Sequence, residues 1–231
     1  HATGWGGATL SMIKAIERLD QSKFSVEVLL IKNSDISKIL HAKGIKYHIA
    51  KNEFYKKYYN YFSHASGGHK WYHLFTLLVV SASWILSRFY FSRIELKNIE
   101  CDIIHLNSSA LTDWLYASSK KATTIIHFRE ALADGYLGIR KSFFRKQVKK
   151  YADHIIAISK DNAARLNLPE KTTVIYNYTE IKPDIENLKN QPQKMVLYVG
   201  GAQIIKGYFT MVDALDYLNE DITVCFCGYY P

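Results

Sequence analysis

The chain has 231 residues, of which 48% are hydrophobic and 22% charged, and this composition excludes an intrinsically disordered protein. At about 150 residues per domain, the length predicts one domain and part of a second. Three cysteines are too few for a disulfide framework, and none forms a ligand pair with a histidine. We therefore expect a reducing, cytoplasmic setting and no metal site.

The net charge of +9 calls for an acidic partner, and the candidates are nucleic acid, an anionic membrane surface and a phosphorylated substrate. Many basic residues stand among aromatic ones between Lys51 and Arg93, as in the run FYKKYYNYF at 54–62. If the tyrosines and lysines of this run form an interfacial patch, the protein should bind anionic vesicles at the inner face of the cell membrane and be released by salt. No recognisable nucleic-acid motif accompanies them, so nucleic acid is not expected as a partner.

The first feature along the chain is the stretch HATGWGGA, in which Gly4, Gly6 and Gly7 lead into an amphipathic helix pattern. Glycines let a backbone approach a ligand closely, and a helix N-terminus directs free N–H groups at an anion. The stretch therefore predicts a turn that binds a phosphate or a sugar diphosphate. Because such a turn normally follows a buried strand, we also expect a segment upstream of His1.

Beyond this turn, apolar runs that predict strands alternate with periodic segments that predict helices. The predicted strands span residues 25–31, 46–49, 102–106, 123–128, 154–158 and 173–176. The predicted helices span residues 8–19, 35–42, 71–98, 110–119, 139–151 and 160–166. This alternation predicts an α/β fold with a doubly wound, Rossmann-like parallel sheet that carries helices on both faces.

Two of the predicted helices raise a question of burial. Residues 72–91 are mostly apolar and in principle long enough to span a bilayer, but they include serines and Arg88 and lead into a strand. We expect a helix packed on the sheet, with partial insertion into one membrane leaflet as the alternative. The expected inward stripe of the other helix consists of Ile139, Phe143, Val148 and Ala152.

Residues 179–194 are rich in charge, Asn and Pro and lack apolar periodicity, so we expect an interdomain linker there. It would separate a first domain at 1–178 from a second, incomplete Rossmann-like unit at 195–231. The elements predicted for the second unit are a strand at 195–199, a glycine-bearing loop at 200–207, a helix at 208–218 and a strand at 222–226.

Six segments follow one another in a characteristic order: GWGGATLSMIKAI, CDIIHLNSS, TTIIHFRE, ADHIIAISKDNAARL, VIYNYTE and LYVGGAQIIKGYFTMVDAL. In this order and spacing the chain resembles the family 4 glycosyltransferases of GT-B fold. The resemblance implies two facing Rossmann-like domains that hold a nucleotide sugar and transfer its sugar with retention of anomeric configuration. The acceptor would be a glycan or a lipid-linked molecule, and no metal or other cofactor would be required besides the donor.

The chain would then be the N-terminal, acceptor-side domain with the beginning of the C-terminal domain. In the family, a pair of glutamates in the second domain holds the donor, and they would lie beyond Pro231. We therefore expect residues 1–231 alone to bind poorly and not to catalyse, because a cleft enzyme depends on positioning both reactants between two walls.

Cleavage of the bond between a sugar and a nucleoside diphosphate develops negative charge on the leaving phosphate, so the site needs positioned N–H donors and cations. The resemblance implies that the backbone N–H groups of Gly6 and Gly7 serve this purpose. It also implies that Lys206, followed by Gly207, contacts the diphosphate from the second domain. A glycine stands where the family commonly has an arginine. Unless Arg129 or another cation replaces it, the diphosphate would be only partly neutralised.

His127 stands near the end of a predicted strand, and ligands of doubly wound sheets bind at the carboxyl edge. The resemblance implies that this histidine lies at the sugar, where an imidazole can bind a hydroxyl or accept a proton. Glu130 is expected to orient hydroxyls of the sugar or acceptor, so these two residues are the catalytic candidates. Further candidates for the cleft are Asn107, Ser108, Arg129 and Asn177.

Two other classes of protein remain open. A nucleotide-dependent Rossmann oxidoreductase would show the same alternation, but its fingerprint requires a third glycine where Thr9 stands and an acidic residue where Lys32 and Asn33 stand. A non-enzymatic module that binds membrane or nucleic acid would account for the basic aromatic region. Saturation-transfer NMR with nucleotide sugars, dinucleotides and RNA would separate the three classes.

Overall fold

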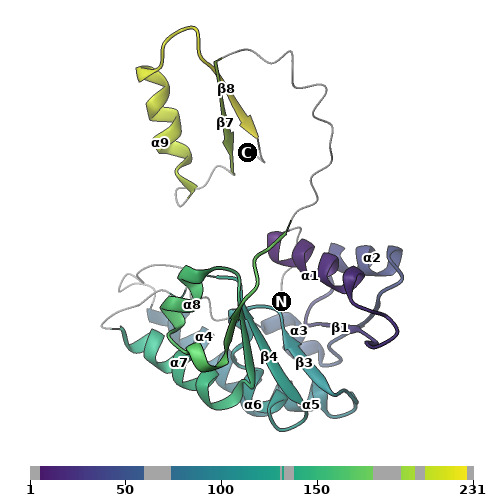
Figure 1. Cartoon of the computed structure of the whole chain (residues 1–231). Coiled ribbons are helices and arrows are strands. Elements are labelled where there is room, and N and C mark those ends of the chain that lie inside the picture. Colours follow the sequence, from purple (N-terminus) through teal and green to yellow (C-terminus); the bar gives the residue numbers. More distant parts are fainter. Residues whose placement is uncertain are drawn as a thin grey trace. The chain divides into compact units, whose positions relative to one another are not determined.

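The computed structural model describes residues 6–59, 74–130, 132, 138–178, 194–200 and 206–227. The chain divides into two compact units, residues 1–178 and 179–231 (Figure 1). Each unit is described by itself. The predicted linker at 179–194 falls almost wholly outside the described residues. Within those ranges, no helix combines the length and the apolar character that crossing a bilayer would require.

The strands of the first unit pair in parallel, as predicted, but in two sheets. Strand β1 (Glu27–Leu30) pairs with β2 (Lys46–Ile49). The second sheet has the order β3-β4-β5-β6 and consists of β3 (Ile103–Leu106), β4 (Thr123–Phe128), β5 (His154–Ala157) and β6 (Thr172–Val174). The predicted α/β class with parallel strands is confirmed, and the described strands of this unit are divided between these two sheets.

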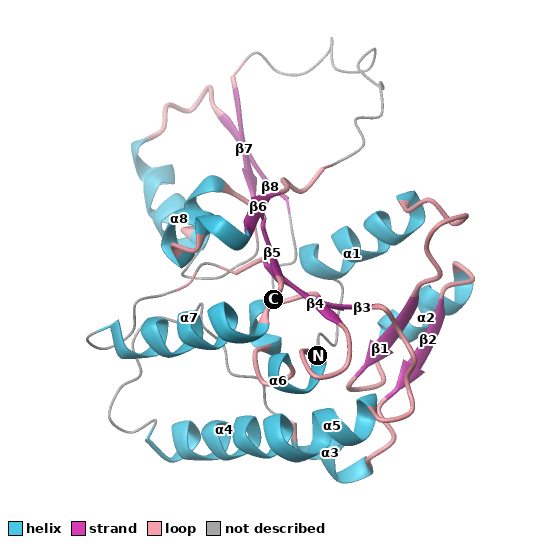
Figure 2. Ribbon diagram, turned by 60° about the horizontal axis from the view of Figure 1, so that its bottom comes forward, coloured by secondary structure: helices cyan, strands magenta, loops and turns pink. Residues whose placement is uncertain are grey.

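The helices of this unit cover the two sheets. They are α1 (Gly7–Arg18), α2 (Asp35–Ala42), α3 (Glu53–Tyr58), α4 (Leu74–Leu86), α5 (Ser92–Leu96), α6 (Leu115–Ser118), α7 (Ile139–Tyr151) and α8 (Lys160–Leu166). Successive strands from β3 to β6 step in one direction, so right-handed crossovers place their connecting helices on one face. Figure 2 shows α4, α5, α6 and α7 on that side of the four strands and α1 on the other.

The main core lies between the four-stranded sheet and these helices. Leu106, Ile126 and Ile155 stand opposite one another on neighbouring strands and are all buried. Phe144 and Val148 of α7 pack into the same cluster. A second cluster joins α1 and α2 to the smaller sheet, and its members are Ile13, Val28, Leu30, Ile36 and Leu40.

The inward stripe of α7 differs from the prediction. Phe144 and Val148 are buried, together with Ala152, whereas Ile139 is 66% exposed and Phe143 41% exposed. Residues four apart share one face of a helix, so the buried pair at 144 and 148 fixes the rotation of α7 and turns Ile139 outward.

The predicted helix at 71–98 is interrupted. The α-helix ends at Leu86, a π-helical turn spans Ser87–Phe91, and α5 follows. A π-turn accommodates an extra residue and so changes which side chains face inward. Here it buries Ser87 and Arg88. The predicted helix at 110–119 is likewise reduced to a 3-10 turn, Ser109–Leu111, and the short α6.

Helix α3 was not predicted, although Asn52 caps it by accepting a hydrogen bond from the Tyr55 backbone N–H at 2.9 Å. Tyr55 and Tyr59, which were expected in an exposed patch, are 2% and 4% exposed. The Tyr55 ring stacks on Phe91 with centroids 4.7 Å apart, and its hydroxyl accepts a hydrogen bond from Trp114 Nε1 at 2.9 Å. These contacts place Tyr55 in the core.

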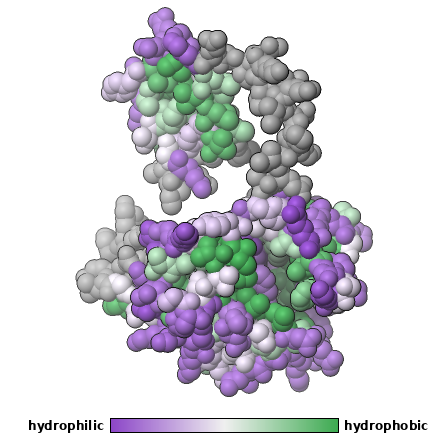
Figure 3. All heavy atoms as spheres, viewed as in Figure 1, coloured by the Kyte–Doolittle hydropathy of each residue, from purple (hydrophilic) through white to green (hydrophobic). Residues whose placement is uncertain are grey.

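The second unit has two parallel strands and one helix: β7 (Met195–Val199), β8 (Thr223–Cys227) and α9 (Tyr208–Asp213), which continues into a 3-10 turn, Ala214–Tyr217. None of its described residues is fully buried, and Val199 is 74% exposed. Figure 3 shows apolar side chains gathered on the visible face of this unit. The unit is therefore an incomplete Rossmann-like layer.

Candidate active site at the carboxyl edge of the sheet

Several loops of the first unit meet where the parallel strands β3, β4 and β6 end. The chain leaves β3 at Asn107, β4 at Arg129 and β6 near Asn177. Because parallel strands end at the same edge of a sheet, the sequence predicted that these polar residues would be neighbours. The structure brings all three together and adds Ser11 from the beginning of α1.

Arg129 is the centre of this cluster. Its Nε and Nη2 atoms donate to Asn107 Oδ1 at 3.1 Å and 2.9 Å. Its Nη1 atom donates to Ser11 Oγ at 3.0 Å and to Asn177 Oδ1 at 3.2 Å. Burial lowers the pKa of Arg129, and the Glu130 carboxylate offsets part of this effect. A guanidinium nevertheless stays charged. The result is a cation held in one orientation by three side chains.

The N-terminus of α1 lies beside this cation. Gly6 is the N-cap residue and Gly7 the first helical residue, and among the described residues no side chain caps the helix. Asn107 Nδ2 donates to the Ala8 carbonyl at 3.4 Å, which ties the first turn to the end of β3. The free N–H groups and positive dipole end of a helix favour an anion. The start of α1 at Gly6 and Gly7 is therefore close to a fixed guanidinium, whereas Gly4 and the rest of the predicted turn lie outside the described residues.

Within the part of the chain that the structure describes, the space around the two glycines is open. An added Cβ atom at Gly6 or Gly7 would meet no described atom within 4 Å. The φ and ψ of Gly6, −132° and 160°, are extended values that any residue adopts. The fold itself thus makes no demand for glycine here, and the open space is available to a ligand.

Glu130 is engaged by one loop. Its Oε1 atom accepts from Ser108 Oγ at 2.7 Å, and its Oε2 atom accepts from Ser109 Oγ at 2.6 Å and from the Ser109 backbone N–H at 3.2 Å. Ser108 also accepts from the Ala110 N–H at 3.1 Å and is 1% exposed. The carboxylate thus joins the loops after β3 and β4, and Ser108 is a buried capping residue. The roles expected for Glu130 at the sugar or acceptor hydroxyls and for Ser108 in the cleft stay predictions.

His127 lies on β4 beside His105 of β3, with ring centroids 5.5 Å apart and planes 16° from parallel. It is 8% exposed, and neither ring nitrogen has a hydrogen-bond partner in the part of the chain that the structure describes. Burial, followed by the charge of Arg129, lowers the pKa of His127 to about 3. The ring is therefore neutral at physiological pH. An unpaired buried polar ring is costly, and a substrate hydroxyl would relieve this cost.

Lys206 and Gly207 belong to the second unit. Gly207 has φ +73° and precedes α9, and this left-handed value favours glycine. The Lys206 carbonyl accepts a hydrogen bond from the Tyr198 hydroxyl at 3.0 Å, while its side chain is exposed. Their expected contact with a diphosphate stays a prediction.

Sequence reasoning missed Ser11 and Ser109. Ser11 stands four residues after Gly7, on the same helical face, and that spacing was the available signal. Ser109 follows Ser108, which was singled out, but only the three-dimensional structure shows that Ser108 and Ser109 both bind Glu130. Within the described ranges, no three His, Cys, Asp or Glu side chains come together as a metal site.

The sequence model named Glycosyltransferase Family 4 matches residues 5–181. The chain belongs to glycosyltransferase family 4. The match includes every candidate of the first unit, from Gly6 to Asn177, and excludes Lys206 and Gly207 of the second. No curated protein matches the sequence of this family 4 chain.

Solved structures show the same fold. The family 4 chain is similar to Anabaena Alr3699/HepE in complex with UDP, at 18% identity and a TM-score of 0.64, over 100% of this chain and 60% of HepE. HepE in complex with UDP-glucose matches at 18% identity and a TM-score of 0.60, over 98% and 58%. Acinetobacter baumannii MurG matches at 12% identity and a TM-score of 0.53, over 98% and 57%. The fold is thus that of GT-B glycosyltransferases, and the chain spans about 60% of the HepE structure.

Proposed function

We propose that this chain is part of a glycosyltransferase that moves a sugar from a nucleoside diphosphate to a glycan or lipid-linked acceptor, with retention of configuration. The observation that carries the proposal is the Arg129 cluster beside the uncapped N-terminus of α1. Family membership supports the reaction class. The HepE structures, which hold UDP and UDP-glucose, support a nucleotide sugar as donor.

The diphosphate of the donor would meet two kinds of positive potential at this edge. The N–H groups after Gly6 offer hydrogen bonds, and Arg129 offers a charge whose orientation is already fixed. Donors that need no reorganisation stabilise a developing charge more than mobile ones do. The second unit has a glycine where the family commonly has an arginine. We infer that Arg129 supplies the positive charge at the diphosphate in its place, with Lys206 as a second cation.

His127 would act on hydroxyl groups. A neutral imidazole can accept a hydrogen bond from a hydroxyl group, and the low pKa of His127, about 3, keeps the ring neutral. Glu130 would act indirectly, by holding the loops that carry Ser108 and Arg129. For a cytoplasmic setting the support is the free state of Cys101, Cys225 and Cys227.

The test is a donor screen on the full-length protein with UDP, GDP and ADP sugars, scored by release of the nucleoside diphosphate and by NMR of the product's anomeric centre. We expect turnover with one donor class and a product of the donor's anomeric configuration. An inverted product would refute retention. Binding of NAD with no affinity for any nucleotide sugar would refute the proposal as a whole.

A further inference from the structure

The helical segment from α4 to α5 turns a row of large apolar side chains to solvent. Every member is at least 41% exposed, and Phe75 reaches 76%. We call this row the α4–α5 stripe; it consists of Phe75, Leu78, Ile85, Phe89, Tyr90 and Ile94. Exposed apolar rows of this kind mark sites that contact a protein or a membrane.

The opposite side of the same segment is buried and contains polar residues as well as the apolar Trp84, Phe91 and Leu96. Ser87 and Ser92 are 0% exposed, Arg88 is 6% exposed and Glu95 is 7% exposed. A surface helix of a globular protein normally keeps its large apolar residues on the buried face and polar residues outside. The apolar side chains of the stripe therefore do not pack into the core.

Hydrogen bonds fix this orientation. Ser87 Oγ donates to the Asp113 carboxylate inside the unit. Glu95 accepts hydrogen bonds from the backbone N–H groups of Lys51 at 2.8 Å and Asn52 at 2.9 Å. Rotating the helix to hide the stripe would break these buried bonds and leave buried polar groups unpaired, which destabilises the fold. The stripe is thus held outward.

Arg88 is a further anchor. Its guanidinium lies 4.9 Å from the ring centroid of Tyr151 and 5.1 Å from those of Trp84 and Tyr116. Cation–π contacts of this kind hold a buried charge in place. The inward cation of the segment is therefore packed among aromatic rings, and the outward charges are separate from it.

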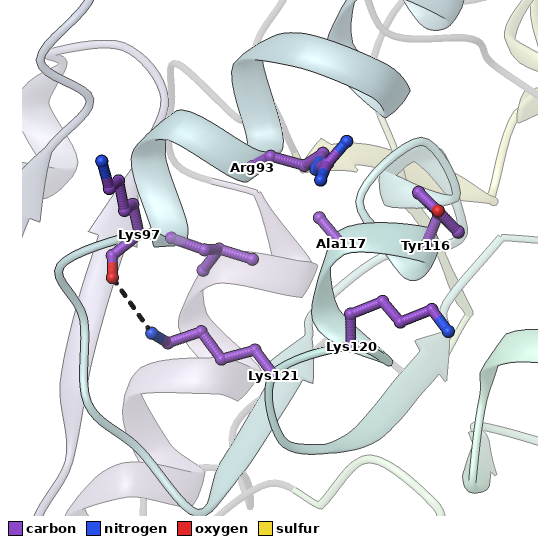
Figure 4. Close-up of a pocket in the computed structure, with 7 residues that line it drawn as sticks. Arg93, Lys97, Tyr116, Ala117, Lys120 and Lys121 are labelled. Carbon is purple, nitrogen blue, oxygen red and sulfur yellow. Dashed lines mark hydrogen bonds between the residues drawn. The ribbon is translucent and has the colours of Figure 1, made fainter.

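Those outward charges stand at the α5 end of the stripe. An open pocket of about 430 Å³ lies between α5 and the turn after α6, and Figure 4 shows the cationic side chains extending around it from these two elements. The cations are Arg93, Lys97, Lys120 and Lys121. Lys121 Nζ donates to the Lys97 carbonyl at 3.3 Å. No acidic residue lines the pocket, and none of the four forms an ion pair within the described ranges.

We propose that the α4–α5 stripe inserts its apolar side chains into the interfacial region of an anionic bilayer and that the pocket receives the phosphate of a phospholipid headgroup. An apolar row with a cluster of unpaired cations at its end matches the two layers of such a surface, acyl chains and anionic headgroups. The surface differs from the one that the sequence suggested at 55–59, where two of the three tyrosines are buried. It does not depend on the proposed transfer reaction.

The test is co-sedimentation of the full-length protein with phosphatidylcholine vesicles, with and without phosphatidylglycerol, at low and high salt. We expect binding to the anionic vesicles and release by salt, because exposed charges are screened within about 10 Å at 0.1 M. Lys120→Gln with Lys121→Gln should lower the partition coefficient about 25-fold, at about 1 kcal/mol or about fivefold for each lysine. Lys146→Gln with Lys149→Gln, on the exposed face of α7, is the matched control and should bind almost normally.

A second pair of variants tests the apolar part. Ile85→Asp should abolish binding, whereas Phe24→Asp, which also changes an exposed apolar residue, should not. Equal binding of the pocket and control variants, or equal binding to neutral and anionic vesicles, would overturn the proposal. A dimer in light scattering that Ile85→Asp dissociates, with no vesicle binding, would replace the bilayer with a second copy of the chain. Sugar transfer to a water-soluble acceptor, assayed on the same variants, should be unchanged, which separates this proposal from the proposed function.

Discussion

Arg129→Met is the most informative substitution, because it removes a charge and keeps the length of the side chain. The wild-type guanidinium makes four hydrogen bonds to three residues, two of them to the same Asn107 oxygen. At about 1 kcal/mol net for each bond, less the overlap at Asn107 and the partial exposure of the site, we expect a loss of about 2 kcal/mol in the free energy of unfolding. The loss of a positioned donor at a developing charge should lower kcat/KM about 10²- to 10³-fold.

The assay is release of the nucleoside diphosphate by the full-length protein, with the free energy of unfolding measured by chemical denaturation of the same samples. Arg145→Met is the matched control. Arg145 lies on α7 and also donates a hydrogen bond, to the Asn167 carbonyl at 2.9 Å. Arg129→Lys should retain part of the activity, because it keeps the charge but cannot reach all three partners. A normal kcat/KM for Arg129→Met, combined with reduced stability, would show that Arg129 only holds the loops together.

Three further predictions concern other residues. His127→Phe should retain the stacking on His105 and most of the stability but lower kcat at least tenfold by our proposal, and an unchanged kcat would remove His127 from the site. Gly7→Val should weaken donor binding in calorimetry without lowering the melting temperature, because nothing lies within 4 Å of the added Cβ; equal affinity would contradict the phosphate placement. Burial raises the pKa of Asp113 to about 7 in the folded state, so the folded protein holds this proton more tightly and stability should fall as pH rises from about 4 to 7, by a value on the order of 4 kcal/mol. Asp113→Asn should remove this dependence in denaturation measured across that range, and an identical pH profile would refute the assignment.

Much of the fold was predictable because it depends on local patterns. The strands at 46–49 and 123–128 and the helices at 35–42 and 160–166 have the predicted bounds, since each has a regular apolar period between clear end signals. The meeting of Asn107, Arg129 and Asn177 followed from the rule that parallel strands end at one edge.

The rest depends on contacts between distant segments. Periodicity reveals an apolar row in the helix after residue 74 but not which side faces the core, and that choice is made by the bonds of Ser87 and Glu95 to other elements. The hydrogen bonds from Ser108 and Ser109 to Glu130 join two loops that are more than 20 residues apart in the sequence. Tyr55 belongs to the same aromatic run as the exposed Tyr58, and its burial depends on its stacking on Phe91 and on the hydrogen bond of its hydroxyl with Trp114.

The central claim, that the edge formed by α1 and Arg129 binds the donor diphosphate, is tested most directly by a crystal structure of the full-length protein with the nucleotide sugar that it uses. The account predicts phosphate oxygens within hydrogen-bond distance of the N–H groups that follow Gly6, with the Arg129 guanidinium beside them. A diphosphate bound without any contact with α1 or Arg129 would contradict it.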